Sequence, residues 1–222
     1  MTNADGPASG VGATTPGGGA SGRGATTPGG GASGEAPSDV FARRPKRADA
    51  RRNYEKLLTA AREAFAEAGV SASLEDIARR AGVGIGTLYR HFPTRQDLFE
   101  SVYIDEVEAL CRTADDLAGQ PPWDALAGWL RRFVTYTATK RAIAEALNHD
   151  SPVFATCRKA IDAAGQPLLS RAQKSGDARP DASFDDVLRL VGGVTMYPFA
   201  DPAQLERVLT MALDGIRERP EG

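Results

Sequence analysis

The chain has 222 residues, 41% hydrophobic and 25% charged, with a formal net charge of −2 and a mean hydropathy of −0.33. It has no apolar run of the ~18 residues that a membrane span requires and no secretory signal pattern at its start, so we expect a cytoplasmic protein with no membrane partner. Its two cysteines, Cys111 and Cys157, lie far apart without zinc-site spacing, which favours reduced thiols and no metal.

The first part of the chain is a tail of Gly, Ala, Ser, Thr and Pro. The stretch GATTPGGGASG occurs at 12–22 and again at 24–34, a repeat with a 12-residue period. Such a segment has almost no large apolar side chains to bury, and its glycines lose much entropy on ordering. We therefore predict a disordered region over residues 1–42.

Charge is distributed unevenly over the rest of the chain. Residues 41–100 carry 12 Lys/Arg against 8 Asp/Glu, whereas residues 101–222 carry 14 against 18. A basic arm precedes the first predicted helix; it consists of Arg43, Arg44, Lys46, Arg47, Arg51 and Arg52. A basic module joined to an acidic one favours nucleic acid as a partner of the first, although such a run is often only a solvated segment.

Helical patterns begin at about residue 51. Apolar residues at i, i+3, i+4 spacing predict a helix over 51–68, which Gly69 ends. Ser73 is a predicted N-cap of a second, short helix with Asp76 at its third position, and Gly82 stops it. A third short helix is predicted at 85–91, and a fourth runs from Arg95, after the Thr94 cap, towards residue 117.

Proline and glycine separate further helical patterns in the second half of the chain. We predict helices at about 123–139, 141–148, 152–175, 183–196 and 203–218. No convincing alternation typical of strands appears. The predicted fold class is all-α, with about nine helices.

The segment LEDIARRAGVGIGTLYRHF (74–92) has helix-turn-helix spacing. Ala78 is small where two helices cross, Gly82 suits a left-handed turn, and Val83 and Leu88 anchor the second helix. The second helix would expose residues that its own core does not need: Ile85, Gly86, Thr87, Tyr89, Arg90 and His91. The pattern alone is also compatible with a plain helical hairpin.

At this point the sequence resembles the TetR family of transcriptional repressors. The resemblance rests on NYEKLLTAAREAFAEAGV, LEDIARRAGV, GTLYRHF and PTRQDLFESVY, and it runs continuously over about 47–103. It implies a three-helix helix-turn-helix domain at 43–103 and a helical ligand-binding and dimerisation domain at 104–222. The expected partners are double-stranded DNA with a roughly palindromic operator, a small-molecule ligand and a second copy of the chain.

Roles in DNA binding follow from the resemblance, position by position. The recognition helix would contain Gly84, Ile85, Gly86, Thr87, Tyr89, Arg90 and His91. Lys46 and Arg47 belong to the arm, Ser73 and the helix that it caps would hold a phosphate, and Arg95 stands where the family often has a phosphate-contacting lysine. Gly84 and Ile85 depart from the family's usual serine and polar residue, which favours recognition of DNA backbone and shape.

The second half of the chain carries the predicted ligand pocket. Trp123, Trp129, Phe133 and Tyr136 share one predicted helix, and Phe154, Cys157 and Met196 are candidates to face them. Aromatic residues at helical spacing are more often core than pocket. The expected ligand is apolar or amphipathic; His149 and Asp150 do not make a metal site, and no cofactor is expected.

The last two helices are the predicted dimer interface. Leu188, Val191 and Val194, with Gly192 and Gly193 allowing close approach, would form a four-helix interface with the partner. The resemblance implies that a ligand moves the helix at 95–117 and changes the ~34–36 Å separation of the two recognition helices.

Other function classes remain open at this stage. An enzyme is disfavoured, because no Ser/His/Asp grouping, phosphate-binding glycine loop or metal cluster is present and no catalytic residue is predicted. An adaptor that keeps the fold without binding operators is disfavoured by the basic arm. A transcriptional activator or a ligand-independent regulator of the same fold is the alternative reading.

Overall fold

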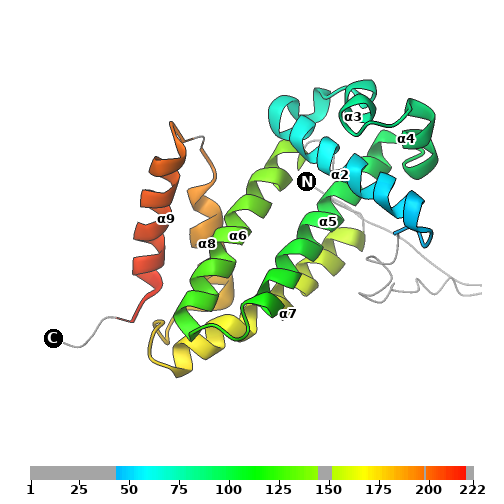
Figure 1. The fold of residues 1–222 in the computed structure, drawn as a ribbon. Coiled ribbons are helices and arrows are strands. Elements are labelled where there is room, and N and C mark those ends of the chain that lie inside the picture. The colour runs from blue at the N-terminus through cyan, green and yellow to red at the C-terminus, as the bar shows by residue number, and fades with distance from the viewer. Residues whose placement is uncertain (1–43, 145–151, 198, 219–222) are drawn as a thin grey trace, which may run out of the picture. The chain divides into compact units, whose positions relative to one another are not determined.

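A computed structural model describes residues 44–144, 152–197 and 199–218 of the chain (Figure 1). Its helices are α2 (Ala48–Ala68), the short 3-10 helix η2 (Gly69–Ser71), α3 (Leu74–Arg80), α4 (Ile85–His91), α5 (Arg95–Asp116), α6 (Pro122–Ala142), α7 (Pro152–Lys174), α8 (Phe184–Val194) and α9 (Pro202–Ile216). The predicted all-α class is confirmed: within the described ranges there are eight α-helices, and the one β-type pairing is an isolated bridge between Ala178 and Arg217.

Most predicted helices are confirmed, although one predicted break is wrong and two helix ends are shifted. The break predicted between residues 139 and 141 does not exist, because α6 continues through Ala142 with Lys140 and Arg141 in its last turn. The rest of the helix predicted over 141–148, together with His149, Asp150 and the tail at 1–42, lies outside the described residues. The last two helices end earlier than predicted, α8 at Val194 and α9 at Ile216.

The helix-turn-helix is built from α3 and α4 packed on α2. Gly82 has φ 68°, a conformation that costs other residues about 1–2 kcal/mol, and it allows the chain to turn sharply between the two helices. The amide of Val83 then donates to the Ala78 carbonyl at 3.0 Å. Ile77 and Leu88, both fully buried, hold the pair against the domain, so the opposite face of α4 is left to solvent.

The remaining helices pack around α5, α6 and α7. Trp129 of α6 is fully buried, and its indole Nε1 donates to the Leu110 carbonyl of α5 at 3.1 Å. Gly165 of α7 faces this ring closely, since a Cβ placed there would lie 2.6 Å from Trp129 and 2.3 Å from Phe184. The absence of a side chain at residue 165 therefore lets α6, α7 and α8 meet.

Replacing Gly165 by alanine should destabilise the protein by about 1–3 kcal/mol, because two buried aromatic rings must shift to admit the methyl group. Gly86→Ala is the matched control, because a Cβ at residue 86 meets nothing within 4 Å. Thermal unfolding followed by circular dichroism measures both variants. If Gly165→Ala has the same melting temperature as Gly86→Ala, the contact between α6, α7 and α8 is looser than described.

The domain boundary predicted between residues 103 and 104 falls inside α5. This helix is continuous from Arg95 to Asp116 and packs against α2 as well as against α6 and α7. The two predicted domains, 43–103 and 104–222, therefore share one continuous helix, α5. By contrast, α9 packs mainly on α8, with one ion pair to α6 between Arg131 and Glu206 at 3.0 Å.

Candidate functional site

The outward face of α4 is the first candidate site. Ile85 and Tyr89 are one turn apart and are 37% and 46% exposed, unusually high values for large apolar side chains. Arg90 is also exposed, and Gly84 and Gly86 open onto free space. Thr87 is half-buried. The face is thus smooth, partly apolar and poor in hydrogen-bonding groups, which suits contact with a groove more than dense base readout.

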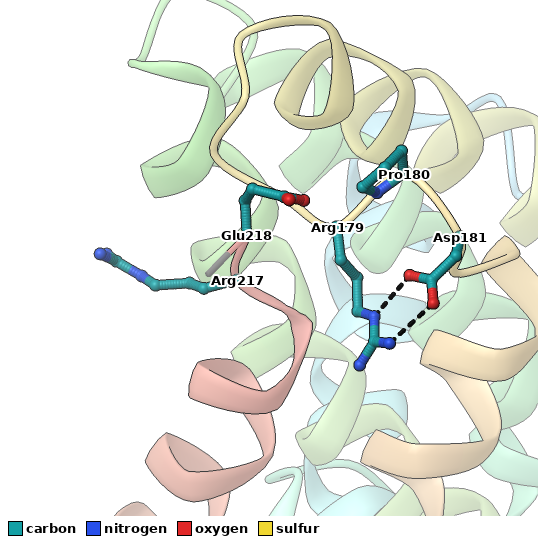
Figure 2. A pocket seen from close by; sticks show the side chains of 5 residues that line it. All are labelled: Arg179, Pro180, Asp181, Arg217 and Glu218. Carbon is teal, nitrogen blue, oxygen red and sulfur yellow. Dashed lines mark hydrogen bonds and ion pairs between the residues drawn. The ribbon is translucent and has the colours of Figure 1, made fainter. Parts of the chain in front are cut away.

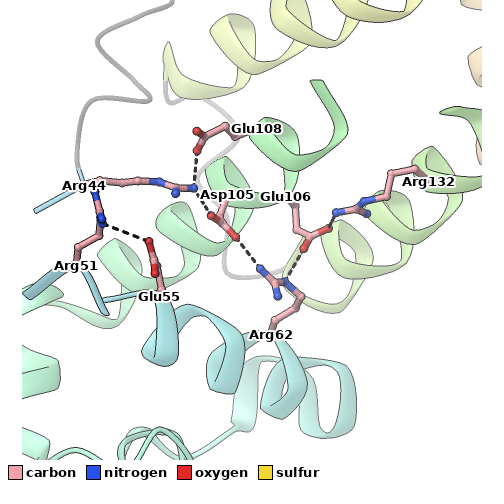
Figure 3. A network of polar contacts seen from close by, with 8 residues as sticks. All are labelled: Arg44, Arg51, Glu55, Arg62, Asp105, Glu106, Glu108 and Arg132. Carbon is pink, nitrogen blue, oxygen red and sulfur yellow. Dashed lines mark hydrogen bonds and ion pairs between the residues drawn. The ribbon is translucent and has the colours of Figure 1, made fainter. Parts of the chain in front are cut away.

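The basic arm divides into a free part and a paired part. Lys46 and Arg47 are exposed and form no ion pair with any residue that the structure describes; Arg47 also occupies the N-cap position of α2. Arg44, in contrast, reaches back to α5 and pairs with Asp105 and Glu108, each at 2.7 Å (Figure 3). Arg51 and Arg52 pair with Glu55 and Asp49, so among the described residues of the arm Lys46 and Arg47 present the uncompensated charge.

His91 does not present a cation, contrary to its predicted role. Its ring packs edge-on against Tyr54, with 5.9 Å between centroids, and its Nε2 is buried without a hydrogen-bond partner among the described residues. Burial, and then the charge of Arg90, lower the pKa of His91, so the imidazole is neutral at neutral pH. Its place is in the support of α4.

Arg95 is also turned inward. Its guanidinium donates to the carbonyls of Val70, at 2.7 Å, and Ala72, and it lies 5.5 Å from the centroid of the Phe99 ring. These bonds fasten the link between η2 and α3 to the start of α5. One guanidinium nitrogen thus has a positioning role within the chain, and the phosphate contact of Arg95 stays a prediction.

Ser73 caps α3 as predicted, but its surroundings do not favour an anion. Its hydroxyl accepts from the Asp76 amide at 3.3 Å and donates to the Glu75 carboxylate at 2.8 Å. The backbone hydrogen bond and then the Ser73 hydroxyl lower the pKa of Glu75, which is ionised at neutral pH. Two carboxylates in this first turn would repel a phosphate.

A chain of ion pairs connects the helix-turn-helix to the second half of the protein (Figure 3). Arg62 of α2 lies 2.6 Å from Asp105 and 2.5 Å from Glu106, both on α5. Glu106, whose side chain is 4% exposed, also pairs with Arg132 of α6 at 2.8 Å. Three helices therefore share one buried carboxylate.

The second candidate site is a partly open cavity of about 310 Å³ lined by residues of α5, α6, α7 and α8. Its lining residues are Tyr103, Phe133, Tyr136, Thr137, Lys140, Phe154, Arg158, Ile161 and Leu188. Three predicted pocket residues are among them: Phe133, Tyr136 and Phe154. The aromatic rings lie against one another, with centroids 4.8 Å apart for Tyr103 and Phe154 and 5.6 Å apart for Phe133 and Tyr136.

The other four predicted pocket residues lie elsewhere. Trp129 is sealed in the core, and Cys157 is buried with a thiol pKa raised to about 12 by burial. Trp123 is covered by the guanidinium of Arg217, 4.5 Å from its ring centroid. Met196 is 68% exposed beyond the end of α8. One predicted helix face does not make a pocket, since the walls come from four helices.

Two residues predicted for the dimer interface are also placed differently. Leu188 is 6% exposed and lines the cavity, and Val191 is fully buried. Both therefore pack inside the subunit. Within α8 and α9, Leu190 at 46% and Met211 at 70% are the exposed large apolar side chains, and Met196 and Tyr197 are exposed just beyond the end of α8.

Of the polar groups of the cavity, sequence reasoning found Tyr136 and missed Tyr103, Lys140 and Arg158. The hydroxyls of Tyr103 and Tyr136 lie 3.2 Å apart. Burial raises the pKa of both, to about 12 for Tyr103, so each phenol keeps its proton. The ammonium of half-buried Lys140 lies 6.0 Å from the Tyr103 ring centroid, and burial followed by the charge of Arg158 lowers its pKa.

A further hollow of about 330 Å³ lies between the residues that follow α9, Arg217 and Glu218, and the loop before α8 (Figure 2). Two of its four charged lining residues satisfy each other, since Arg179 pairs with both carboxylate oxygens of Asp181 at 2.6 and 2.7 Å. The Arg179 amide donates to the Ile216 carbonyl at 2.9 Å, so these contacts tie down the end of α9. No group able to hold a metal ion occurs within the described residues.

The protein has a helix-turn-helix whose second helix, α4, is exposed, and a helical second half. These features are typical of helix-turn-helix transcriptional regulators. A family model for bacterial regulatory proteins of the tetR family matches residues 57–102. A second, for the C-terminal domain of SbtR-like transcriptional regulators, matches residues 121–218. The structure also describes no helix long and apolar enough to span a membrane.

Two solved structures match this chain over nearly their whole length. A TetR transcriptional regulator from Streptomyces coelicolor is 39% identical with a TM-score of 0.66, covering 75% of this chain and 99% of its own. A TetR transcription regulatory protein from Mycobacterium vanbaalenii is 33% identical with a TM-score of 0.62, covering 78% and 99%. The chain belongs to the TetR family of DNA-binding transcriptional regulators.

Curated relatives match over a shorter part of the chain. An HTH-type transcriptional regulator of Staphylococcus aureus is 35% identical over 80 residues, which is 35% of this chain and 41% of the relative. Another from the same species is 43% identical over 53 residues, 23% of this chain and 29% of the relative. The chain thus spans less than half the length of these relatives.

Proposed function

We propose that the protein is a homodimeric, cytoplasmic repressor that leaves its operator when a small molecule enters the cavity. The observation that carries this proposal is the course of α5. Tyr103 of α5 lines the cavity, and Arg95 of the same helix holds the link before α3. The two residues are about 12 Å apart along the helix.

A ligand that displaces α5 at Tyr103 would therefore also displace the helix-turn-helix. Binding of this kind shifts a population between conformations that fit DNA and conformations that do not. Useful release needs a coupling of only about 1–3 kcal/mol between the two sites. The buried Glu106, shared by α2, α5 and α6 through Arg62 and Arg132, is a second route for the same movement.

The proposed DNA contacts are the outward residues alone. They are Lys46, Arg47, Gly84, Ile85, Gly86, Thr87, Tyr89 and Arg90. In this proposal Ser73, His91 and Arg95 position α3 and α4 and do not touch DNA. The apolar Ile85 would pack on sugars or a thymine methyl, and the glycines would let the backbone approach closely.

The proposed partner of α8 and α9 is a second copy of the chain. Leu190 and Met211 expose apolar surface on the helix pair, and α9 has little other support within the subunit. Two-fold symmetry would present two recognition helices to a palindromic operator.

Footprinting on the DNA that flanks the protein's own gene tests the proposed function. The proposal predicts specific protection that spans two half-sites and weakens steeply with salt. The protection should disappear when a cell extract that contains the small molecule is added. Protein at micromolar concentration that gives no specific protection would overturn it.

Replacing Arg90 by glutamine should weaken operator binding by the proposed dimer by about tenfold to a hundredfold and reduce the slope of log affinity against log salt by about 1.8, because one phosphate contact is lost in each half-site. Arg112→Gln is the control, since it removes the same charge from an exposed site on α5. Fluorescence anisotropy across a salt series measures both. Equal salt slopes for the two variants would place Arg90 outside the interface.

A further inference from the structure

The charges that line the cavity are unequal in number. Its lining includes two cationic residues, Lys140 and Arg158, and no aspartate or glutamate. Arg158 is compensated at the rim, where it bonds to Asp162 at 3.0 and 3.2 Å and to Asp185 at 2.8 Å. Lys140 pairs with no carboxylate among the residues that the structure describes, so within that part of the chain its charge in the cavity has no counter-ion.

Partial burial of an ammonium disfavours its charged form unless an anion lies beside it. Burial is the main cause that lowers the pKa of Lys140, and the nearby Arg158 adds to it. An anion bound beside the ammonium would remove the cost. The uncompensated charge is a single one, which matches a monoanion.

Hydrogen-bond donors for such an anion are already in place. Between the hydroxyls of Tyr103 and Tyr136, 3.2 Å apart, one proton satisfies the pair and the other is free to point elsewhere. Both phenols keep their protons at neutral pH because burial raises the pKa of each. A carboxylate has two acceptor oxygens, one for the ammonium and one for a phenol.

The rest of the wall is apolar and largely aromatic. Phe133 and Phe154 complete a group of four rings with the two tyrosines, and Ile161 and Leu188 close the far side. Rings of this kind favour another ring in offset or edge contact. A volume of about 310 Å³ is at the small end of ligand pockets, which limits the ligand to one or two rings.

We propose that the ligand is a small aromatic carboxylate, bound with its acid group at Lys140 and the Tyr103–Tyr136 hydroxyl pair and its ring among Phe133, Phe154, Ile161 and Leu188. This inference rests on the proposed function, in which the cavity is the sensing site. It narrows the ligand from apolar or amphipathic molecules to a monoanion with an aromatic body.

The test is direct calorimetric binding to the full chain without DNA. The probes are benzoate, phenylacetate and cinnamate, each beside its neutral primary amide. At least one acid should bind ten or more times more tightly than its amide, because the amide cannot form the charge-assisted bond to Lys140. Failure of all three acids to bind, or equal affinity of acids and amides, would overturn the inference.

Two variants locate the contact. Lys140→Met, which keeps the length of the side chain, should lower acid affinity at least tenfold and leave amide affinity within about twofold. Lys159→Met is the matched control, an exposed lysine of the same helix as Arg158 that lies outside the cavity lining. Tyr136→Phe should cause a smaller loss. An unchanged acid affinity in Lys140→Met, with melting behaviour like that of the parent, would overturn the assignment.

The same acids added to an operator complex separate this inference from the proposed function. Acids that bind by calorimetry but leave the DNA complex intact support the inference and contradict ligand-induced release. An operator complex that dissociates with the neutral amides as readily as with the acids supports release and contradicts the inference.

Discussion

Replacing Glu106 by glutamine is expected to destabilise the protein by about 2–4 kcal/mol and lower its melting temperature by about 5–10 °C. The side chain is 4% exposed, and its carboxylate is shared by Arg62 at 2.5 Å and Arg132 at 2.8 Å. Glutamine keeps the shape but removes the charge, so Arg132 loses the carboxylate with which it pairs and Arg62 keeps only Asp105. Removing one member of a buried ionic group is much more costly than the net value of the group.

Glu108→Gln is the control for this prediction. Its side chain is 28% exposed, and Arg44, with which it pairs, keeps its second partner Asp105. A partly exposed pair of this kind contributes about 0–1 kcal/mol. Chemical denaturation of both variants gives the two free energies of unfolding. If Glu106→Gln unfolds at the same denaturant concentration as Glu108→Gln, the ion-pair chain does not connect α2, α5 and α6 in the way described.

The helix-turn-helix could be predicted from the sequence because its signals are local. A cap at Ser73, a left-handed glycine at residue 82 and apolar residues at helical spacing each act within a few residues of chain. The structure confirms these elements, with φ 68° at Gly82 and a fully buried Leu88. The predicted recognition surface at Gly84, Ile85 and Tyr89 stays a prediction, although all three are exposed.

The cavity could not be predicted in the same way, because its walls come from helices far apart in the chain. Tyr103 of α5 and Leu188 of α8 meet only after folding, and helical spacing within α6 could not separate Phe133, which lines the cavity, from the sealed Trp129. The apolar pattern of α8 likewise has two faces. The more hydrophobic one, with Val191, packs inward, and Leu190 is left outside.

The partners of charged residues were the hardest feature to predict from the sequence. A sequence shows that Arg95, Lys140 and Glu106 carry charge but not which groups surround them. Arg95 was assigned to phosphate by position, yet its guanidinium bonds to the carbonyls of Val70 and Ala72. Lys140 lies in a helix turn that was predicted to be a break, so its place in a cavity wall had no signal in the sequence.

The proposed dimer requires an apolar contact surface on the outer face of α8 and α9. Leu190 borders a shallow hollow of about 290 Å³ with Gly215 of α9, and Met211 lies one helical turn before that glycine. Both side chains are too exposed to contribute much to the subunit's own core. Charge placed on them should therefore oppose association while leaving the subunit folded, since an unpaired carboxylate cannot be buried in an apolar interface without a large cost.

A protein carrying both Leu190→Glu and Met211→Glu should be monomeric at micromolar concentration and should bind its operator about a hundredfold or more weakly. The affinity falls because two linked recognition helices gain from effective concentration, and a monomer loses this gain entirely. Sedimentation and anisotropy measure the two effects, and Ala163→Glu on the exposed face of α7 adds the same charge as a control. A double variant that remains dimeric would place the interface on another face, whereas a monomer with undiminished operator affinity would show that DNA recognition does not need the pair.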